Sequence, residues 1–241
     1  MITIQDWMPW YFKIRDYLGL SYEEDAKATL ILDDLLPSTN IREILHKLKE
    51  KLRGKDVYVV GCGTSIKVLS RKYQRMFTTK RDNFFILAAD GATTALLEID
   101  VVPDVIVTDL DGRIEDLLVA NEKGATIFIH AHGDNIDKLK KYVLLFHNQV
   151  IGTTQVEPTN KILNFFGFTD GDRAVFLAYH LGAAKVTLIG MDFENMVSKY
   201  SKPYFSKDTK ATDFKRKKLE IGKKLLSWLQ KKECIELIFV R

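Results

Sequence analysis

Short, uninterrupted runs of hydrophobic residues alternate with amphipathic stretches over most of the chain. Seven such runs predict buried strands, at 57–60, 84–87, 105–107, 126–129, 150–151, 186–189 and 235–240. The stretches between them have the three- and four-residue spacing of helices, at 66–76, 114–121, 136–146, 173–181 and 213–232. Strands that are buried on both faces read as continuous apolar runs, so we expect an α/β fold with a mostly parallel sheet covered by helices on both faces.

The first part of the chain has a different pattern. From about Ile4 to Lys51 the apolar positions recur at helical spacing, for example at Ile41, Ile44 and Leu48, before a turn at Gly54. We therefore expect a small helical N-terminal segment, residues 1–53, attached to an α/β domain, residues 54–241. A chain of 241 residues is long enough for one main domain and a small appendage.

Composition limits the class of protein further. The two cysteines, Cys62 and Cys234, lie far apart and form no C-x-x-C pair, which indicates neither a disulfide framework nor a zinc site. The first residues are charged and lack the apolar run of a signal peptide, and no stretch reaches the roughly 20 apolar residues of a membrane span. A net charge of +4 is too small to indicate nucleic acid binding. We expect a cytoplasmic protein with neither a membrane nor a nucleic acid as partner.

Polar clusters follow six of the predicted strands. They are residues 61–65, 89–94, 108–112, 130–135, 152–155 and 190–193, and a seventh cluster at 167–173 begins a helix. Ligands of open α/β sheets bind at the carboxyl ends of the strands. Glycine and aspartate also form ordinary turns, but clusters after six strands predict one continuous polar site.

The first cluster, G-C-G-T-S, lies between a strand and a helix, where backbone N–H groups can bind an anion. Gly61, Gly63, Thr64 and Ser65 are therefore candidate phosphate-binding residues. The turn lacks the third glycine of the dinucleotide fingerprint and the lysine of a Walker loop, so a purely structural turn is the alternative.

Two pairs of aspartates have the spacing of a metal site. Asp109 and Asp111 follow a strand, in which residues two apart point to the same side, and oxygen ligands of this kind suit Mg²⁺. Asp170 and Asp172 repeat the spacing before Arg173. Each pair could instead cap a turn or a helix. Taken together, the four carboxylates and the arginine predict a clamp for a metal ion and a triphosphate.

Other polar residues are candidates for the rim of the site. His130 and His132 share one side of their strand, but no third nitrogen or sulfur ligand lies near enough in sequence to complete a zinc site, so contact with phosphate or substrate competes with simple packing. The remaining candidates, each of which alone would be read as a turn residue, are Asp90, Gly91, Asp134, Asn135, Thr154, Gln155 and Asp192. Nucleophile-elbow and protein-kinase signatures are absent from the sequence.

Six motifs in this order resemble one known family. They are A-A-D-G-A-T-T-A-L-L-E, P-D-V-I-V-T-D-L-D-G, H-A-H-G-D-N, G-T-T-Q, G-F-T-D-G-D-R-A and I-G-M-D-F. The chain resembles the archaeal 6-hydroxymethyl-7,8-dihydropterin diphosphokinases, a group related to the thiamine pyrophosphokinases. One departure is the turn G-C-G-T-S-I, in which relatives commonly have a proline before the serine.

The resemblance implies a thiamine-pyrophosphokinase-like fold, Mg²⁺, a homodimer, and transfer of diphosphate from ATP to the pterin in tetrahydromethanopterin or folate-type biosynthesis. We expect Asp109 and Asp111, with Asp170 or Asp172, to hold the metal, and Asp172 to orient the pterin hydroxyl. Arg173 and Lys218 or Lys215 would cover the triphosphate. In this interpretation Gly61, Gly63, Thr64, Ser65, Asp90, Gly91 and Lys218 bind ATP, and His130, His132, Asp134, Asn135, Thr154, Gln155 and Asp192 bind the pterin.

Three other functions stay open from the sequence. The acceptor could be thiamine, the protein could be a nucleotide-sugar transferase of the sialyltransferase kind, or it could be a nucleotide-binding regulator without turnover.

Overall fold

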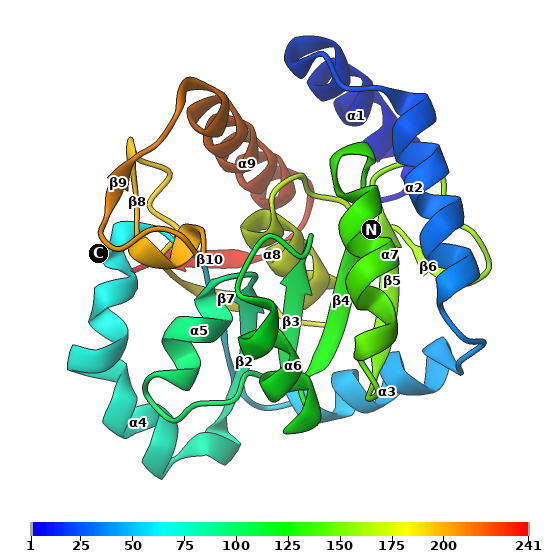
Figure 1. Ribbon diagram of the computed structural model, residues 1–241. Coiled ribbons are helices and arrows are strands. Elements are labelled where there is room, and N and C mark those ends of the chain that lie inside the picture. The colour runs from blue at the N-terminus through cyan, green and yellow to red at the C-terminus, as the bar shows by residue number, and fades with distance from the viewer. Residues whose placement is uncertain (1, 241) are drawn as a thin grey trace.

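The computed structural model describes residues 2–240, which form an eight-stranded sheet surrounded by helices (Figure 1). The strands are β1 (Asp56–Val60), β2 (Phe84–Ala89), β3 (Val105–Thr108), β4 (Thr126–Ala131), β5 (Val150–Thr154), β6 (Ile162–Leu163), β7 (Lys185–Ile189) and β10 (Glu236–Phe239). Their order is β10-β7-β1-β2-β3-β4-β5-β6, and every neighbouring pair is parallel. The predicted α/β class with a mostly parallel sheet is confirmed. Strand β6 and an antiparallel pair, β8 (Met196–Val197) with β9 (Thr209–Lys210), were not predicted, because two residues are too few to leave a pattern.

The helices follow the predicted spacing with two exceptions. They are α1 (Ile4–Leu18), α2 (Tyr22–Leu35), α3 (Ile41–Leu52), α4 (Gln74–Thr79), α5 (Ala92–Leu97), α6 (Ile114–Glu122), α7 (Ile136–Tyr142), α8 (Asp170–His180) and α9 (Asp213–Lys232). The predicted helix 66–76 is instead a 3₁₀ turn (Thr64–Lys67), a π-helical turn (Leu69–Tyr73) and the start of α4. The short helix α5 was missed, because its first residues read as part of a polar turn.

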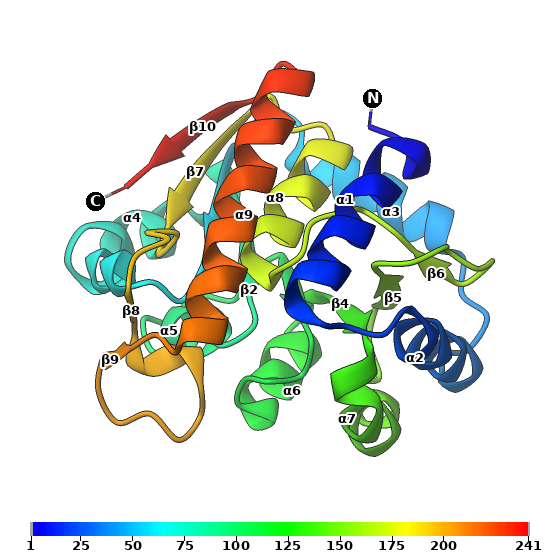
Figure 2. The ribbon, with the colours of Figure 1, turned by 90° about the horizontal axis from the view of Figure 1, so that it is seen from above.

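The strand residues alternate between two hydrophobic layers. In β1, Val57 and Val59 face one layer and Tyr58 and Val60 face the other. Helices α8 and α9, together with α1, cover the first face, and α4 to α7 cover the second (Figure 2). Each fully buried large apolar side chain contributes roughly 1.5–3 kcal/mol.

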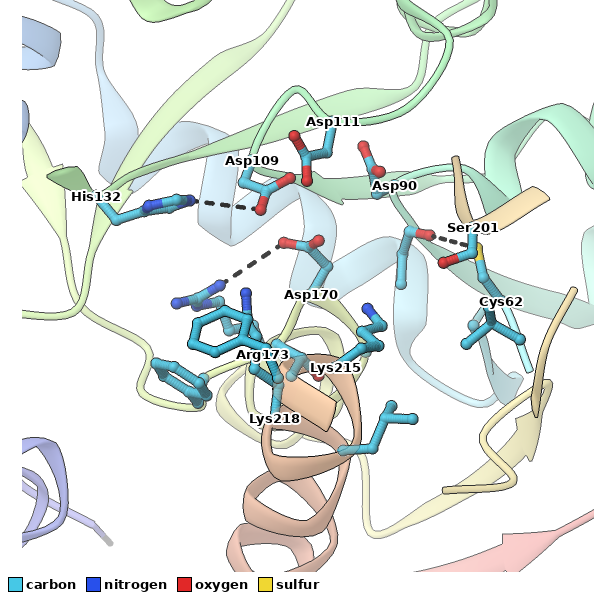
Figure 3. A pocket seen from close by; sticks show the side chains of 18 of the residues that line it. Cys62, Asp90, Asp109, Asp111, His132, Asp170, Arg173, Ser201, Lys215 and Lys218 are labelled. Atoms are coloured by element: carbon cyan, nitrogen blue, oxygen red, sulfur yellow. Dashed lines mark hydrogen bonds and ion pairs between the residues drawn. The ribbon is translucent and has the colours of Figure 1, made fainter. Parts of the chain in front are cut away.

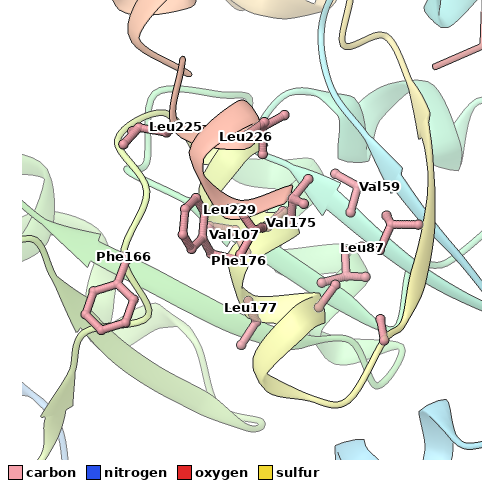
Figure 4. Close-up of a cluster of buried hydrophobic side chains, with 14 of the residues drawn as sticks. Val59, Leu87, Val107, Phe166, Val175, Phe176, Leu177, Leu225, Leu226 and Leu229 are labelled. Atoms are coloured by element: carbon pink, nitrogen blue, oxygen red, sulfur yellow. The ribbon is translucent and has the colours of Figure 1, made fainter. Parts of the chain in front are cut away.

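The centre of the first layer joins the sheet to two helices. Leu87 and Val107 of the strands pack with Phe176 of α8 and Leu229 of α9, and all four side chains are almost fully buried (Figure 4). Helix α8 therefore lies against the sheet with α9 outside it. This packing holds the first turn of α8 at the carboxyl ends of the strands.

The N-terminal helices share the core of the sheet. Trp7 and Tyr11 of α1 are fully buried in the same hydrophobic cluster as the first layer, and Trp10 contacts Trp228 of α9 with ring centroids 5.6 Å apart. The start of α2 packs against the first layer and its Leu32 is buried in the second, so α2 covers the β5–β6 edge of the sheet (Figure 2). The helices before residue 54 and the sheet that follows it therefore share one hydrophobic core.

The strand order reverses between β1 and β7. From β1 the chain adds strands in one direction as far as β6, and α8 then returns it to β7 on the other side of β1. The two turns at this point touch, since Gly63 N donates to Gly190 O at 2.7 Å and a Cβ on Gly63 would lie 2.7 Å from the same oxygen. A switch point of this kind is the usual ligand site of an open α/β sheet. Within residues 2–240, none of the helices is both long and apolar enough to cross a bilayer.

Candidate active site

A cavity of about 560 Å³ lies at the carboxyl ends of the strands. Its walls come from the turns after β1, β2, β3, β4, β5 and β7, from the first turns of α8 and α9, and from the connection between α1 and α2. A cavity of this size at the switch point has the volume and position of a small-molecule site. The polar clusters predicted from the sequence therefore meet in one place.

Three carboxylates form the centre of the cavity. Asp90, Asp109 and Asp170 each have an oxygen within 4.8 Å of the others, and they come from the ends of β2 and β3 and the start of α8 (Figure 3). Oδ1 of Asp109 and Oδ1 of Asp170 are buried and accept no hydrogen bond within residues 2–240. Asp90 is held in place because its Oδ1 accepts from Thr108 Oγ1 at 2.5 Å and from Gly112 N at 3.0 Å.

The charges of this cluster oppose one another. Burial and the charge of the nearby Asp109 together raise the pKa of Asp90 to about 6. Burial and the same neighbours also raise the pKa of Asp170 well above its usual range. Burial acts in the same direction on Asp109, but the hydrogen bond and charge of His132 and the charge of Lys218 leave the pKa of Asp109 below its usual range. A divalent cation would relieve this repulsion, and a set of oxygen ligands suits Mg²⁺.

Asp111 does not extend this cluster. Its two oxygens accept from Lys138 and Lys202, which tie the turn to α7 and to the segment after β8. The sequence predicted that Asp109 and Asp111 point the same way, as residues two apart do in a strand. Strand β3 ends at Thr108, and Leu110 has a φ of 65°, so the backbone turns between the two aspartates. Asp90 takes the place next to Asp109 that was predicted for Asp111.

Asp172 lies outside the cavity, in contrast to its predicted metal-binding and catalytic role. It is fully buried, and it accepts from Phe168 N at 2.6 Å, Thr169 N at 2.9 Å and Thr169 Oγ1. With Thr169 it forms the capping box of α8. The structure thus gives Asp172 a structural role, because the third position of a helix directs a carboxylate to the free N–H groups before it.

Basic side chains face the carboxylates across the cavity. Arg173, Lys215 and Lys218 lie opposite Asp109 and form the other wall (Figure 3). The guanidinium of Arg173 lies 3.7 Å from Asp170 Oδ1. Burial lowers the pKa of Lys218, whose Nζ lies 5.5 Å from the centre of the Phe168 ring. The arrangement leaves room between acids and bases for an anionic group that is shared by a cation and the basic side chains.

The first turn is held by the protein itself. Asp192 Oδ2 accepts from Ser65 N at 2.8 Å and from Thr64 Oγ1 at 3.3 Å, and its Oδ1 accepts from Ser65 Oγ. Gly61 and Gly63 line the cavity, whereas Thr64 and Ser65 do not. The backbone N–H of Ser65, which was predicted to bind phosphate, thus donates to Asp192 instead. Thr64 and Ser65 therefore fit the alternative interpretation of a purely structural turn.

Gly91, also predicted to bind ATP, lies outside the cavity. A Cβ on Gly91 would lie 1.9 Å from the carbonyl oxygen of Tyr200. The glycine therefore allows the segment after β8 to pack against the turn after β2. That close contact accounts for the residue type without a nucleotide.

The two histidines have different places. His132 lines the cavity and places Nε2 3.4 Å from Asp109 Oδ2 (Figure 3). His130 is buried behind it, with Nδ1 3.1 Å from Thr153 Oγ1, and burial lowers the pKa of His130 well below its usual range. Of the two, only His132 can meet a ligand without a change of structure.

The other predicted rim residues also differ in whether they line the cavity. Asp134, Asn135, Gln155 and Asp192 line the cavity. Asn135 also holds the turn after β3, since its Nδ2 donates to Asp109 O at 3.0 Å. Thr154 does not reach the cavity, because its Oγ1 pairs with Thr29 Oγ1 of α2 at 2.7 Å.

The N-terminal helices supply cavity residues that the sequence did not indicate. Gly19, Leu20, Ser21, Glu24 and Asp25 line one end. Asp25 is 3% exposed, although it lies in the acidic first turn of α2. Asp and Glu favour the first turn of any helix, so the sequence carries no signal that separates Asp25 from its exposed neighbours.

The fold and site together define the class of the protein. It is an open, doubly wound α/β protein whose switch-point cavity sets a carboxylate cluster against basic side chains. A family model described as 6-hydroxymethylpterin diphosphokinase MptE-like matches residues 35–198. The chain belongs to this family of diphosphotransferases.

Three relatives extend the match to nearly the whole chain. Proteins from Pyrococcus furiosus, Methanothermobacter thermautotrophicus and Methanocaldococcus jannaschii are each named 6-hydroxymethyl-7,8-dihydropterin pyrophosphokinase. They are 44%, 42% and 41% identical to this chain over 94%, 95% and 98% of its length, and over 94%, 96% and 100% of their own. The alignment with the Methanocaldococcus jannaschii protein omits only about 2% of this chain, so it includes most of α1 and α2, whereas the family model's match begins at residue 35.

A more distant likeness involves a solved structure. The MAf glycosyltransferase from Magnetospirillum magneticum AMB-1 aligns with 62% of this chain and 28% of its own at a TM-score of 0.40 and 19% identity. This likeness is too weak to carry an argument about fold or function.

Proposed function

We propose that this protein transfers diphosphate from ATP to the hydroxymethyl group of 6-hydroxymethyl-7,8-dihydropterin in a Mg²⁺-dependent reaction that releases AMP. The product, the pterin diphosphate, would serve tetrahydromethanopterin or folate-type biosynthesis. The names of three relatives that match along nearly the whole chain support the reaction. The observation that carries the proposal is the cluster of Asp90, Asp109 and Asp170 facing Arg173 and Lys218.

The carboxylate cluster fits a magnesium ion. Its ligand atoms are all oxygens within 4.8 Å of one another, and buried oxygens of Asp109 and Asp170 accept no hydrogen bond within residues 2–240. Bound Mg²⁺ would neutralise charge on the transferred phosphates and on the departing AMP. Asp90, Asp109 and Asp170 would hold it, and His132 keeps the Asp109 carboxylate oriented.

Basic side chains would bind the triphosphate on the opposite side. Phosphoryl transfer requires the protein mainly to position the reactants and to stabilise charge, because its transition state is loose. Arg173 offers planar donors to phosphate oxygens, and Lys215 and Lys218 add positive charge from α9. Since all three face the carboxylates, the phosphates can contact both walls at once.

The two ends of the cavity differ in chemistry, which suggests a place for each substrate. We assign the nucleotide to the switch-point end, at Gly61, Gly63 and Met191, where open α/β sheets bind their ligands. We assign the pterin to the end lined by His132 and Asp134, since its ring carries N–H donors that side-chain acceptors can recognise. The hydroxymethyl group would then reach the phosphates in the middle.

A direct assay tests the reaction. The protein is incubated with ATP, Mg²⁺ and 6-hydroxymethyl-7,8-dihydropterin, and AMP and the pterin diphosphate are separated by chromatography. We expect one AMP for each pterin diphosphate, and loss of turnover when Mg²⁺ is chelated. Asp109→Asn and Asp170→Asn should each raise the barrier by roughly several kcal/mol, whereas Asp137→Asn on the exposed side of α7 should not.

The same assay separates the alternatives. Turnover of thiamine in place of the pterin would assign the acceptor differently. Binding of a cytidine nucleotide without consumption of ATP would favour a nucleotide-sugar transferase. Binding of ATP without AMP formation under any of these conditions would indicate a nucleotide-binding regulator without turnover.

A further inference from the structure

A chain of buried hydrogen bonds connects the N-terminal helices to Arg173. Asp25 Oδ2 of α2 accepts from Tyr11 Oη of α1 at 2.7 Å and from Gln155 Nε2 at 2.7 Å. Gln155 Oε1 in turn accepts from Arg173 Nη2 at 2.8 Å. Tyr11, Asp25, Gln155 and Arg173 are each at most 7% exposed. Three of the four residues lie in α1, α2 and α8 and the fourth in the turn after β5, and their contacts span up to 130 positions in the sequence.

The hydrogen-bond donors and acceptors of these four residues can pair in only one arrangement. Burial and the neighbouring Asp25 raise the pKa of Tyr11, so the phenol stays a donor. Asp25 Oδ1 accepts from Gly133 N at 2.8 Å, so the carboxylate receives three hydrogen bonds. A carboxylate that only accepts forces the amide of Gln155 to present its NH₂ group to Asp25 and its oxygen to Arg173. The orientation of Gln155 thus depends on Asp25.

This series of hydrogen bonds holds Arg173 in place without neutralising its charge. The partner that Arg173 Nη2 contacts directly is a neutral amide oxygen, and the carboxylate of Asp25 lies one residue further away. Arg173 lines the cavity, and its Nη1 lies 3.7 Å from Asp170 Oδ1, which is too long for a hydrogen bond. The guanidinium is therefore fixed in direction and keeps donors for an anionic ligand.

We propose that Asp25 is a positioning residue that acts through Gln155 to hold Arg173 in the geometry that binds the phosphates. The role rests on the proposed function for its phosphate-bearing substrate. It also gives α1 and α2 a part in catalysis, although they precede the segment that the family model matches. A misplacement of about 1 Å in a positioned group can cost roughly 100-fold in rate, so one lost hydrogen bond in this chain should be measurable.

The test is a double-mutant cycle in the full-length protein. Asp25→Asn replaces an acceptor-only group with an amide that brings its own donor toward Gln155 and Tyr11. We expect kcat/KM for ATP to fall about 10- to 100-fold, with KM for the pterin changed less than about twofold. Calorimetric titration with ATP and Mg²⁺ should find weaker binding. In an Arg173→Lys background, the same Asp25→Asn change should have little further effect, because residues that act as a unit are not additive.

Thr29→Val is the matched control. Thr29 lies one turn after Asp25 on α2, is buried, and bonds Thr154 at the end of the same strand that precedes Gln155. Its loss should loosen the packing of α2 and lower the melting temperature, with kcat/KM for ATP changed less than about twofold at temperatures where the protein is folded.

Three results would overturn the role of Asp25. These are losses that multiply in the Asp25 and Arg173 double variant, a loss in Thr29→Val as large as in Asp25→Asn, or a change confined to KM for the pterin, which would make Asp25 a direct substrate contact. A wild-type protein that forms no AMP from ATP and the pterin would instead contradict the proposed function. The ATP titration then still tests the positioning of Arg173.

Discussion

The carboxylates of the cavity serve three different purposes, which follow from their neighbours. Asp109 and Asp170 keep buried oxygens without hydrogen bonds within residues 2–240, and Asp90 shares their cluster. Asp111 is neutralised by two lysines, and Asp192 holds the turn after β1. Since an unpaired buried carboxylate is costly, the unpaired oxygens are the ones that a cation would complete. Residue type alone does not separate these purposes.

At this scale we predict that Asp90→Asn weakens cation binding more than Asp111→Asn does. Asp90 belongs to the three-carboxylate cluster, whereas both oxygens of Asp111 already accept from lysines. Titration of the protein with Mn²⁺, followed by electron paramagnetic resonance, measures the free ion directly. Removing a ligand should cost roughly several kcal/mol of the stabilisation that the cation provides. Equal affinities of the two variants would contradict the assignment of Asp90 as a ligand.

Helix α8 shows how one element divides its first turn between stability and chemistry. Asp170 and Arg173 point into the cavity, while Asp172 between them turns back to cap the helix. The buried side of α8 packs through Phe176 against the sheet, which fixes its axis. The capping box fixes where the helix begins. Together they place Asp170 and Arg173 opposite the turns after β2 and β3.

We accordingly predict opposite effects for two neighbouring substitutions in α8. Asp172→Asn should lower the free energy of unfolding by about 1–2 kcal/mol through loss of the cap. Its kcat, measured well below the melting temperature, should fall far less than that of Asp170→Asn. Asp170→Asn should not lower the unfolding free energy and should raise it at neutral pH, since burial and the charges of Asp109 and Asp90 raise the pKa of Asp170 in the folded chain. Denaturant unfolding and the AMP assay on the same samples provide both measurements, and a reversed order would contradict this division.

At the scale of the whole molecule, packing far from the cavity makes stability depend on pH. His180 ends α8, donates through Nδ1 to Phe176 O at 2.8 Å and contacts the rings of Phe165 and Phe166 at 5.5 Å each. Burial lowers the pKa of His180 below its ordinary value of 6.5. The unfolded chain therefore takes up a proton at a higher pH than the folded chain does. The contribution of His180 to stability should be fully present above about pH 6.5 and should be lost as the pH falls below that value.

We predict that His180→Asn flattens this dependence. Asparagine can still donate to Phe176 O but does not titrate, so the variant should lose less stability between pH 7 and pH 5 than the wild type, even if it is less stable at pH 7. His46→Gln, an exposed position on α3, is the control and should follow the wild type. Denaturation midpoints at several pH values provide the comparison. An unchanged slope in His180→Asn would show that other groups cause the acid sensitivity.

Much of this architecture is local in origin and can be read from the chain. Runs such as 57–60 and 84–87 are hydrophobic at every position because a parallel strand is buried on both faces, so their pattern can be recognised without knowing the neighbouring strands. The convergence of the polar turns also follows, since parallel strands end at one edge. Asp109, Asp170, Arg173 and His132 were predicted to lie together by this reasoning, and the structure places all four at the cavity.

Contacts between distant parts of the chain decide which side chains of those turns face the cavity. Asp111 does not join the carboxylate cluster, and Asp90 does, because the backbone at Leu110 has a positive φ. Asp172 points away from the cavity because it caps the start of α8. Asp25 reaches Gln155 across 130 positions. Hydrophobic periodicity is a property of neighbours in sequence, whereas the direction of a single carboxylate depends on the donors that folding brings to it.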